Sequence, residues 1–187
     1  MNFAEYNVKD ANFEEILLAL KSLDTVEAVA LGGSRSTGAS DENSDYDIYV
    51  YCAEIPTAET RENLLGKYCS IAEFGNHYWE SEDNTVMNNG TPVDIIYREV
   101  DRFGRYIDTV IKGGKAFNGY TTAFWHNIKN SKVLFDKTGT FTKFRDMAQI
   151  DFPENLRSAI IKNNRNLLNG KLPSYDRQIK KAQERGD

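Results

Sequence analysis

Two aspartates separated by one residue are the first feature of this sequence that could do chemistry. Asp45 and Asp47 open an apolar segment over residues 45–51 that is typical of a strand. Because side chains alternate along a strand, both carboxylates are expected on one face, where they repel each other unless a cation lies between them. Hard oxygen ligands of this kind suit Mg²⁺, together with substrate phosphates and water. The pair therefore predicts a magnesium site.

A glycine turn comes shortly before this pair. Residues 26–31 form an apolar run typical of a buried strand, and the run stops at Gly32, Gly33 and Ser34. Glycine lets the backbone approach a ligand closely, and backbone N–H groups with one hydroxyl are what a phosphate cradle needs. A short helix is expected to begin near Ser34. Together, the turn and the aspartates predict a site for a nucleoside triphosphate.

A third carboxylate follows on a later strand. Asp94 lies in the strand-like segment 91–97, and pairing beside the strand of Asp47 would bring it to the same site. The order of a strand, Gly-Gly-Ser, an Asp-x-Asp strand and an Asp strand resembles the DNA polymerase beta-like nucleotidyltransferase superfamily. The motif covers residues 26–97. Further along, the sequence loosely resembles bacterial nucleotidyltransferases with a helical C-terminal domain, a group that includes antibiotic-modifying enzymes.

The resemblance implies a role for each motif residue. Asp45 and Asp47 would coordinate two Mg²⁺ ions, one of which also holds the triphosphate. Asp94 would bind the catalytic ion and help take the proton from an attacking hydroxyl. Gly33 and Ser34 would hold the β- and γ-phosphates.

Two neighbouring residues are further candidates for nucleotide binding. Arg35 could pair with a phosphate, and Ser44 directly precedes the Asp-x-Asp pair. A surface role for Arg35 and a turn-closing role for Ser44 remain the alternatives. The lone histidines His77 and His126 are interpreted as packing or surface residues.

The remaining pattern predicts the elements that position these residues. Asn12 is the expected N-cap of a first helix, and Asn88-Asn89-Gly90 is typical of a tight turn. In a helix expected over 57–68, Arg61 is placed on the solvated face. Cys69 is placed at the end of that helix. Helices are expected over 13–23, 57–68, 101–112, 120–128, 141–149, 153–169 and 175–185, and further strands over 71–80, 85–87 and 133–135. This predicts an α/β (α+β) fold, in which a small mixed sheet is flanked by helices and followed by a mostly helical region.

We expect a catalytic core over residues 1–114 and a helical C-terminal region over 115–187. The chain has 187 residues, 40% hydrophobic and 27% charged, which is ordinary globular composition. The last residues form a charged helical pattern, which is compatible with a natural protein that continues beyond residue 187. The sequence is also compatible with an oligomer.

The distribution of charged residues along the chain indicates what kind of acceptor substrate the protein uses. The net charge of −5 is unevenly distributed. Residues 151–187 carry eight Lys/Arg and five Asp/Glu, whereas residues 1–150 carry 15 Lys/Arg and 23 Asp/Glu. Proteins that grip nucleic acid usually present a basic field, so the acidic first part makes a nucleic acid acceptor unlikely. We find no membrane span and no secretory signal, and Cys52 and Cys69 are expected to be reduced thiols of a cytoplasmic protein.

The leading hypothesis is a Mg²⁺-dependent nucleotidyltransferase that moves AMP from ATP to a hydroxyl of a small-molecule acceptor. Two alternatives remain open. One is a protein AMPylator, and the other is a non-catalytic module, antitoxin-like or regulatory, that uses the motif to sense nucleotide.

Overall fold

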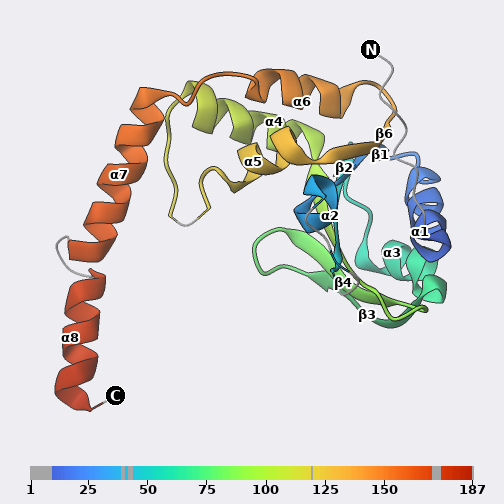
Figure 1. The fold of residues 1–187 in the computed structure, drawn as a ribbon, viewed down its shortest axis with the longest axis horizontal. Helices are drawn as coiled ribbons and strands as arrows, with labels where there is room; N and C mark the ends of the chain where they lie inside the picture. The colour runs from blue at the N-terminus through green and yellow to red at the C-terminus, as the bar shows by residue number, and fades with distance from the viewer. Residues whose placement is uncertain (1–9, 39–40, 42–43, 119, 170–173, 187) are drawn as a thin grey trace. The chain divides into compact units, whose positions relative to one another are not determined.

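The computed structural model describes residues 10–38, 41, 44–118, 120–169 and 174–186 (Figure 1). By its internal contacts the chain divides into two units. The first comprises Met1–Arg105 and His126–Gln149, and the second Tyr106–Trp125 and Ile150–Asp187. Residues 126–149 group with the first unit because β6 (Lys132–Asp136) pairs with β1 (Val26–Leu31). A functional boundary at residue 114 stays a prediction.

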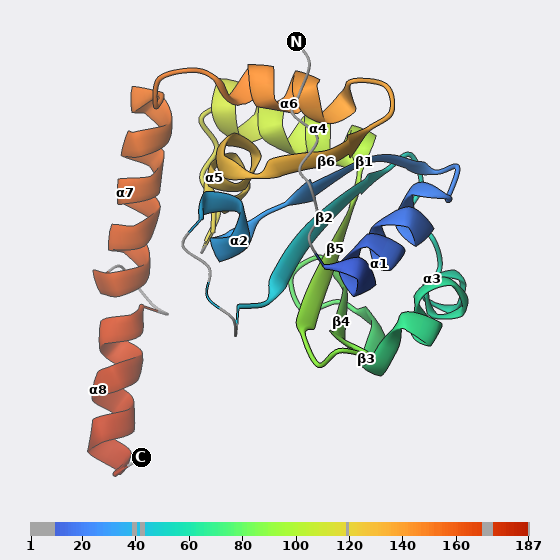
Figure 2. The same ribbon diagram turned by 45° about the vertical axis from the view of Figure 1, so that its right-hand side comes forward.

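The first unit is built on a six-stranded mixed sheet, in the order β3-β4-β5-β2-β1-β6. The other strands are β2 (Tyr46–Cys52), β3 (Cys69–Asn76), β4 (Ser81–Met87) and β5 (Pro92–Glu99). Only β2 and β5 run parallel among the described pairs, and they lie side by side at the centre of the sheet (Figure 2). The predicted mixed α/β fold with a helical C-terminal region is confirmed.

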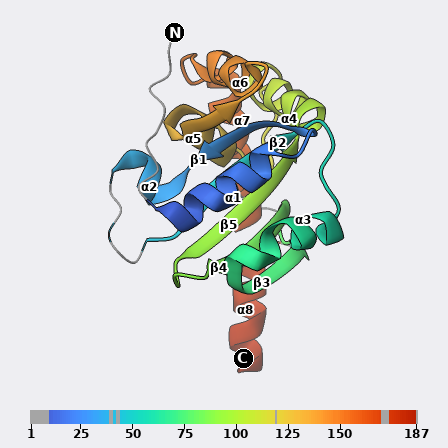
Figure 3. The ribbon, with the colours of Figure 1, turned by 90° about the vertical axis from the view of Figure 1, so that its right-hand side faces the viewer.

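One face of the sheet is covered by α1 (Ala11–Lys21) and α3 (Ala58–Leu65) (Figure 3). The apolar residues of α1 recur at helical spacing, and four of them are buried: Phe13, Ile16, Leu17 and Leu20. They pack against the inward side chains of β1, β2 and β5 in one core. The aspartates of β2 and β5 lie on the other face, because side chains alternate along a strand.

The opposite face carries an aromatic cluster towards the ends of β2 and β5. The Tyr51 ring lies 5.4 Å from Phe103, 5.3 Å from Phe141 and 5.8 Å from Phe144 between ring centroids. Phe103 belongs to α4 (Val100–Ile107), and the other two to α6 (Thr140–Ala148). The same face also contacts α2 (Gly33–Thr37) and α5 (Ala123–Asn130), which appear at the site below.

The second unit is mostly helical. It contains the π-helical segment Asp108–Lys112, α7 (Glu154–Asn169) and α8 (Tyr175–Arg185). Its stacked rings of Trp125 and Phe152 lie 5.3 Å apart between centroids, and Asn163 Nδ2 donates to the carbonyl oxygen of Ala116 at 3.1 Å. None of the helices in the described ranges is both long and apolar enough to cross a lipid bilayer.

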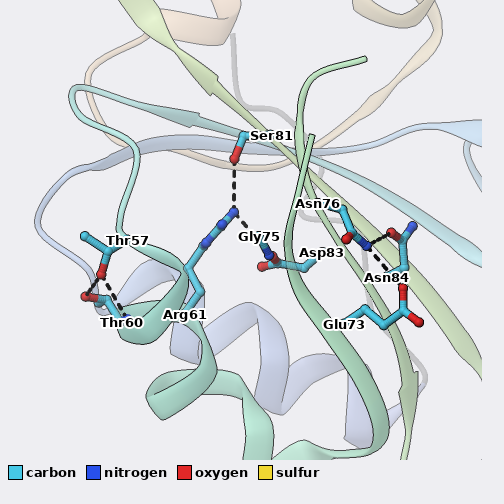
Figure 4. Close-up of polar contacts among 9 residues, drawn as sticks. All are labelled: Thr57, Thr60, Arg61, Glu73, Gly75, Asn76, Ser81, Asp83 and Asn84. Atoms are coloured by element: carbon cyan, nitrogen blue, oxygen red, sulfur yellow. Dashed lines mark hydrogen bonds and ion pairs between the residues drawn. The ribbon is translucent and has the colours of Figure 1, made fainter. Parts of the chain in front are cut away.

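Three sequence predictions about local structure are wrong. Asp10, not Asn12, caps α1, because its Oδ1 accepts from the backbone N–H of Asn12 at 3.0 Å. Cys69 begins β3 after a 3-10 turn over Gly66–Tyr68 instead of ending a helix. Arg61 is not on a solvated face: only 2% of it is exposed, and it forms an ion pair with the buried Asp83 of β4 (Figure 4).

Candidate active site

The sheet register brings the three predicted carboxylates together. Asp47 of β2 is paired directly with Asp94 of the parallel strand β5. Asp45 lies two residues before Asp47, on the same face. One carboxylate oxygen of each aspartate lies within 4.8 Å of the others, and all three side chains are partly buried. The predicted convergence of Asp94 on the Asp-x-Asp pair is therefore present in the fold.

The carboxylate cluster is electrostatically unfavourable without a cation. Burial raises the pKa of Asp47, and the negative charges of Asp45 and Asp94 raise it further. A divalent ion would remove this repulsion, and three carboxylate oxygens are the hard ligands that Mg²⁺ prefers. The donor set thus fits a divalent cation held by Asp45, Asp47 and Asp94.

The glycine turn is fitted closely to this cluster. Gly32 donates its backbone N–H to the carbonyl oxygen of Asp47 at 2.8 Å, which fixes the end of β1 beside the start of β2. Gly33 begins α2 with a φ of 58°, a left-handed conformation that favours glycine. A Cβ on Gly33 would overlap the carboxylate of Asp47. The turn therefore brings backbone to the carboxylates at a distance that only glycine allows.

Arg35 and Ser44 form hydrogen bonds next to the start of β2. The Arg35 guanidinium donates from Nε to the carbonyl oxygens of Ser44 and Asp45, at 3.0 and 2.9 Å, and lies over the ring of Tyr46. The Ser44 hydroxyl donates to Asp41 Oδ1 at 2.9 Å, which closes a turn. These contacts position the backbone of Asp45. Nucleotide binding by Arg35 or Ser44 stays a prediction.

A pocket of about 230 Å³ lies on the α5 side of the glycine turn. Ser34, predicted to bind phosphate, lies in its wall. The other lining residues come from the turn, from α2, from α5 and from the residue after α5: Gly32, Gly33, Ser36, Thr37, His126, Asn127, Asn130 and Ser131. These residues carry hydroxyl, amide and imidazole groups, which can donate to a ligand with many acceptor oxygens, such as a polyphosphate.

The α5 residues of this pocket were not found from the sequence. His126 was interpreted as a packing or surface residue, and Asn127 and Asn130 were not singled out. Asn127 Nδ2 donates to the Tyr49 hydroxyl at 2.7 Å, and Asn130 Nδ2 lies 3.2 Å from His126 Nδ1. Asn127 follows Tyr49 by 78 positions in the chain, and no local motif marks the contact.

Tyr49 and Arg98 extend the site face beyond the carboxylates. Arg98 of β5 pairs with Glu80 through two hydrogen bonds of 2.8 and 2.6 Å, and its guanidinium lies 4.4 Å from the centre of the Tyr49 ring. Burial raises the pKa of Tyr49 to about 12, although the charge of Arg98 opposes this. Tyr49 is therefore a neutral phenol at physiological pH.

The fold and the three carboxylates at a glycine turn define an enzyme that uses a nucleoside triphosphate. The chain belongs to the nucleotidyltransferase domain family, whose model matches residues 13–117. This confirms the resemblance to nucleotidyltransferases and the prediction of a nucleotidyltransferase.

Similar solved structures are distant. One is a toxin–antitoxin with AMP-PNP, 18% identical, which covers 72% of this chain and 82% of its own at a TM-score of 0.42. Another is Cid1 in complex with its short product ApU, also 18% identical, with a TM-score of 0.37. That match covers 54% of this chain and 34% of Cid1. Among proteins of curated function, none matches the chain in sequence.

Proposed function

We propose that this protein is a Mg²⁺-dependent nucleotidyltransferase that moves AMP from ATP to a hydroxyl of a small-molecule acceptor and releases pyrophosphate. One observation carries the proposal. Asp45, Asp47 and Asp94 offer carboxylate oxygens within 4.8 Å of one another, directly against the turn of Gly33. A metal site and a phosphate site in contact are what a bound triphosphate needs.

Each residue then has a definite role. Asp45 and Asp47 hold Mg²⁺, which when bound neutralises charge on the phosphates and stabilises the attacking and leaving oxygens. The turn at Gly33 and the Ser34 hydroxyl hold the terminal phosphates. Asp94 would help to hold a cation, and its carboxylate would accept the proton of the attacking hydroxyl. The acceptor oxygen bonds to the α-phosphorus as the bond from that phosphorus to the bridging oxygen breaks, and pyrophosphate leaves.

A small-molecule acceptor is supported by charge. Residues 1–150, which carry the whole carboxylate site, contain 23 acidic and 15 basic residues. This excess of negative charge attracts a cationic acceptor and repels a polyanion. The two cysteines are free thiols, in agreement with the cytoplasmic location we propose.

A nucleotide and acceptor screen tests the proposal. The full chain is incubated with Mg²⁺, each of the four nucleoside triphosphates and a panel of hydroxyl-bearing acceptors, including cationic aminoglycoside-like compounds. Mass spectrometry should detect an acceptor heavier by one AMP unit. Asp47→Asn should abolish this product, whereas Asp24→Asn, at an exposed acid before β1, should leave it unchanged.

Other outcomes redirect the proposal. An AMP unit found on protein side chains instead would identify a protein AMPylator. Nucleotide binding with no transfer to any acceptor would favour a sensing module. Calorimetry adds a separate check: ATP should bind much more tightly with Mg²⁺ than with EDTA, and equal affinities would contradict the metal assignment.

A further inference from the structure

Asp94 is held by a side chain that no sequence motif marks. Asn84 lies on β4, directly opposite Asp94 on β5, and Asp94 is in turn directly opposite Asp47 on β2. Asn84 Nδ2 donates to Asp94 Oδ1 at 2.9 Å. One oxygen of the third carboxylate therefore has a fixed donor, and its other oxygen is left for a cation.

The amide of Asn84 is itself oriented from the edge strand (Figure 4). Asn76 of β3 donates from Nδ2 to Asn84 Oδ1 at 2.8 Å and to Glu73 Oε2 at 3.4 Å. Because Asn84 Oδ1 accepts from Asn76, the amino group of Asn84 must face Asp94. A chain of hydrogen bonds thus runs across three neighbouring strands and ends on carboxylates at both sides.

From this geometry we infer that Asn84, oriented by Asn76, is a positioning residue for Asp94. The inference rests on the proposed function, in which Asp94 holds a cation and takes a proton. An amide is suited to this task. It donates a charge-assisted hydrogen bond that fixes the carboxylate rotamer, yet it adds no charge to compete with the cation. Residues that orient a metal ligand in this way typically contribute about 10- to 100-fold to metal affinity or activity.

The hydrogen bond could also serve only to stabilise the β4–β5 pairing, and the experiment separates the two roles. Asn84→Leu removes the donor at nearly constant size, and Asn76→Leu removes only the group that orients Asn84. Asn88→Leu is the matched control: it lies in the turn after β4, and its Nδ2 donates to the carbonyl oxygen of Lys67 at 3.0 Å, away from the carboxylates. Thermal unfolding measured by circular dichroism reports the cost of each change to stability.

Two readouts are specific to positioning. The first is Mn²⁺ affinity without nucleotide, measured by calorimetry or electron paramagnetic resonance. The second is the division of any kinetic loss between kcat and the KM for ATP. We expect Asn84→Leu to lower Mn²⁺ affinity and kcat by about 10-fold or more with little change in KM. Asn76→Leu should cause a smaller loss of the same kind, and Asn88→Leu should change neither value.

The outcomes distinguish this inference from the proposed function. If the wild type is active and a folded Asn84→Leu keeps Mn²⁺ affinity and kcat within about twofold, the positioning role is wrong and the function stands. If the wild type transfers no nucleotide, but Asn84→Leu binds Mn²⁺ more weakly than the wild type does, the proposed function is wrong and the positioning role stands. No Mn²⁺ binding by the wild type, or equal losses in the Asn84 and Asn88 variants, would also overturn the inference.

Discussion

Gly33 lies directly against the carboxylate of Asp47, without room for a side chain between them. The glycine turn and the Asp-x-Asp strand are therefore fitted to each other, and neither can move without displacing the other. The backbone hydrogen bond from Gly32 to Asp47 keeps this contact in place. In the function we propose, this contact would fix the distance between the phosphates and the cation.

Gly33→Ala should abolish most activity. The new methyl group would displace the Asp47 carboxylate, and alanine is strained at a φ of 58°. We expect kcat/KM to fall by about 100-fold, the loss that a misplacement of about 1 Å can cause. Steady-state kinetics with the acceptor found in the screen measures this.

Gly38→Ala is the matched control for this variant. Gly38 follows α2 with a φ of 79°, but nothing lies within 4 Å of the position that its Cβ would take. Backbone strain should therefore cost about 1–2 kcal/mol of stability and leave activity nearly intact. Equal activity losses in the two variants would show that strain, and not the contact with Asp47, is responsible.

Asp47→Asn should stabilise the metal-free protein while it abolishes turnover. Burial and the neighbouring charges raise the folded-state pKa of Asp47 above 3.8, so its ionisation opposes folding. The stabilising contribution of the protonated group is present at low pH and is lost as pH rises through the raised pKa. In EDTA, the Tm of Asp47→Asn should therefore exceed that of the wild type near neutral pH, with a smaller difference in acid.

The expected change is a rise in Tm, since relief of the repulsion raises the free energy of unfolding and with it the Tm. Mg²⁺ should raise the Tm of the wild type more than that of the variant, because binding to the folded state stabilises it. Asp24→Asn, at an exposed position, is the control. A lower Tm for Asp47→Asn in EDTA would contradict the repulsion.

The local sequence was enough to predict the centre of the site. The strand over 26–31, the turn at Gly33 and the two-residue spacing of Asp45 and Asp47 are encoded within 22 residues, so hydrophobic pattern and turn chemistry define them. Asp94 could be added because its strand has the same alternation and follows a clear tight turn, with Gly90 at a φ of 87°. The register that pairs Asp94 with Asp47 then follows from which face is buried.

The residues around this centre were not predictable, because their roles depend on distant contacts. Arg61 has the helical spacing of a surface residue, and only the position of Asp83, 22 residues later, makes it a buried group. Asn84 has no signal of its own, and its role arises from the strand register. His126 and Asn127 reach the glycine turn only because β6 returns the chain to the edge of the sheet.

Tyr49→Phe should loosen the pocket wall that α5 provides. The variant removes the hydroxyl to which Asn127 Nδ2 donates at 2.7 Å, and leaves that amide without its partner. We expect a loss of about 1 kcal/mol in unfolding free energy and a modestly weaker affinity for MgATP, because Asn127 lines the pocket. Tyr78→Phe, at a tyrosine that is 71% exposed, should change neither.

Alkaline pH tests the environment of Tyr49 separately. Its pKa of about 12 lies above the ordinary value of 10, so the stability that the neutral phenol contributes is lost as pH rises from about 10 through 12. Over that range the wild type should lose stability relative to Tyr49→Phe. The difference in phenolate absorbance at 295 nm between the wild type and Tyr49→Phe should show that Tyr49 ionises above pH 11. Ionisation near pH 10 would contradict the buried environment.

Arg61→Leu should destabilise the β3–β4 side of the sheet without acting on the carboxylate site. The side chains of Arg61 and Asp83 are 3% and 0% exposed, and their ion pair spans 3.3 Å between Nη1 and Oδ1 (Figure 4). The backbone N–H of Gly75 also donates to Asp83 Oδ1, at 2.9 Å. Removing Arg61 leaves a buried carboxylate without its cation, which costs about 3–5 kcal/mol. Urea unfolding followed by circular dichroism measures this loss.

The double variant Arg61→Leu/Asp83→Leu decides whether the uncompensated charge causes the loss. Replacing both partners of a buried pair with apolar residues is often close to neutral, so the double variant should recover most of the lost stability. Glu154→Ala breaks the exposed pair with Arg157, in which the side chains are 79% and 59% exposed, and should cost less than about 1 kcal/mol. If the double variant is no more stable than Arg61→Leu, lost packing is the cause. The side chains of the pair would then stabilise the fold by filling space. Neutralisation of the buried Asp83 carboxylate by Arg61 would not contribute to stability.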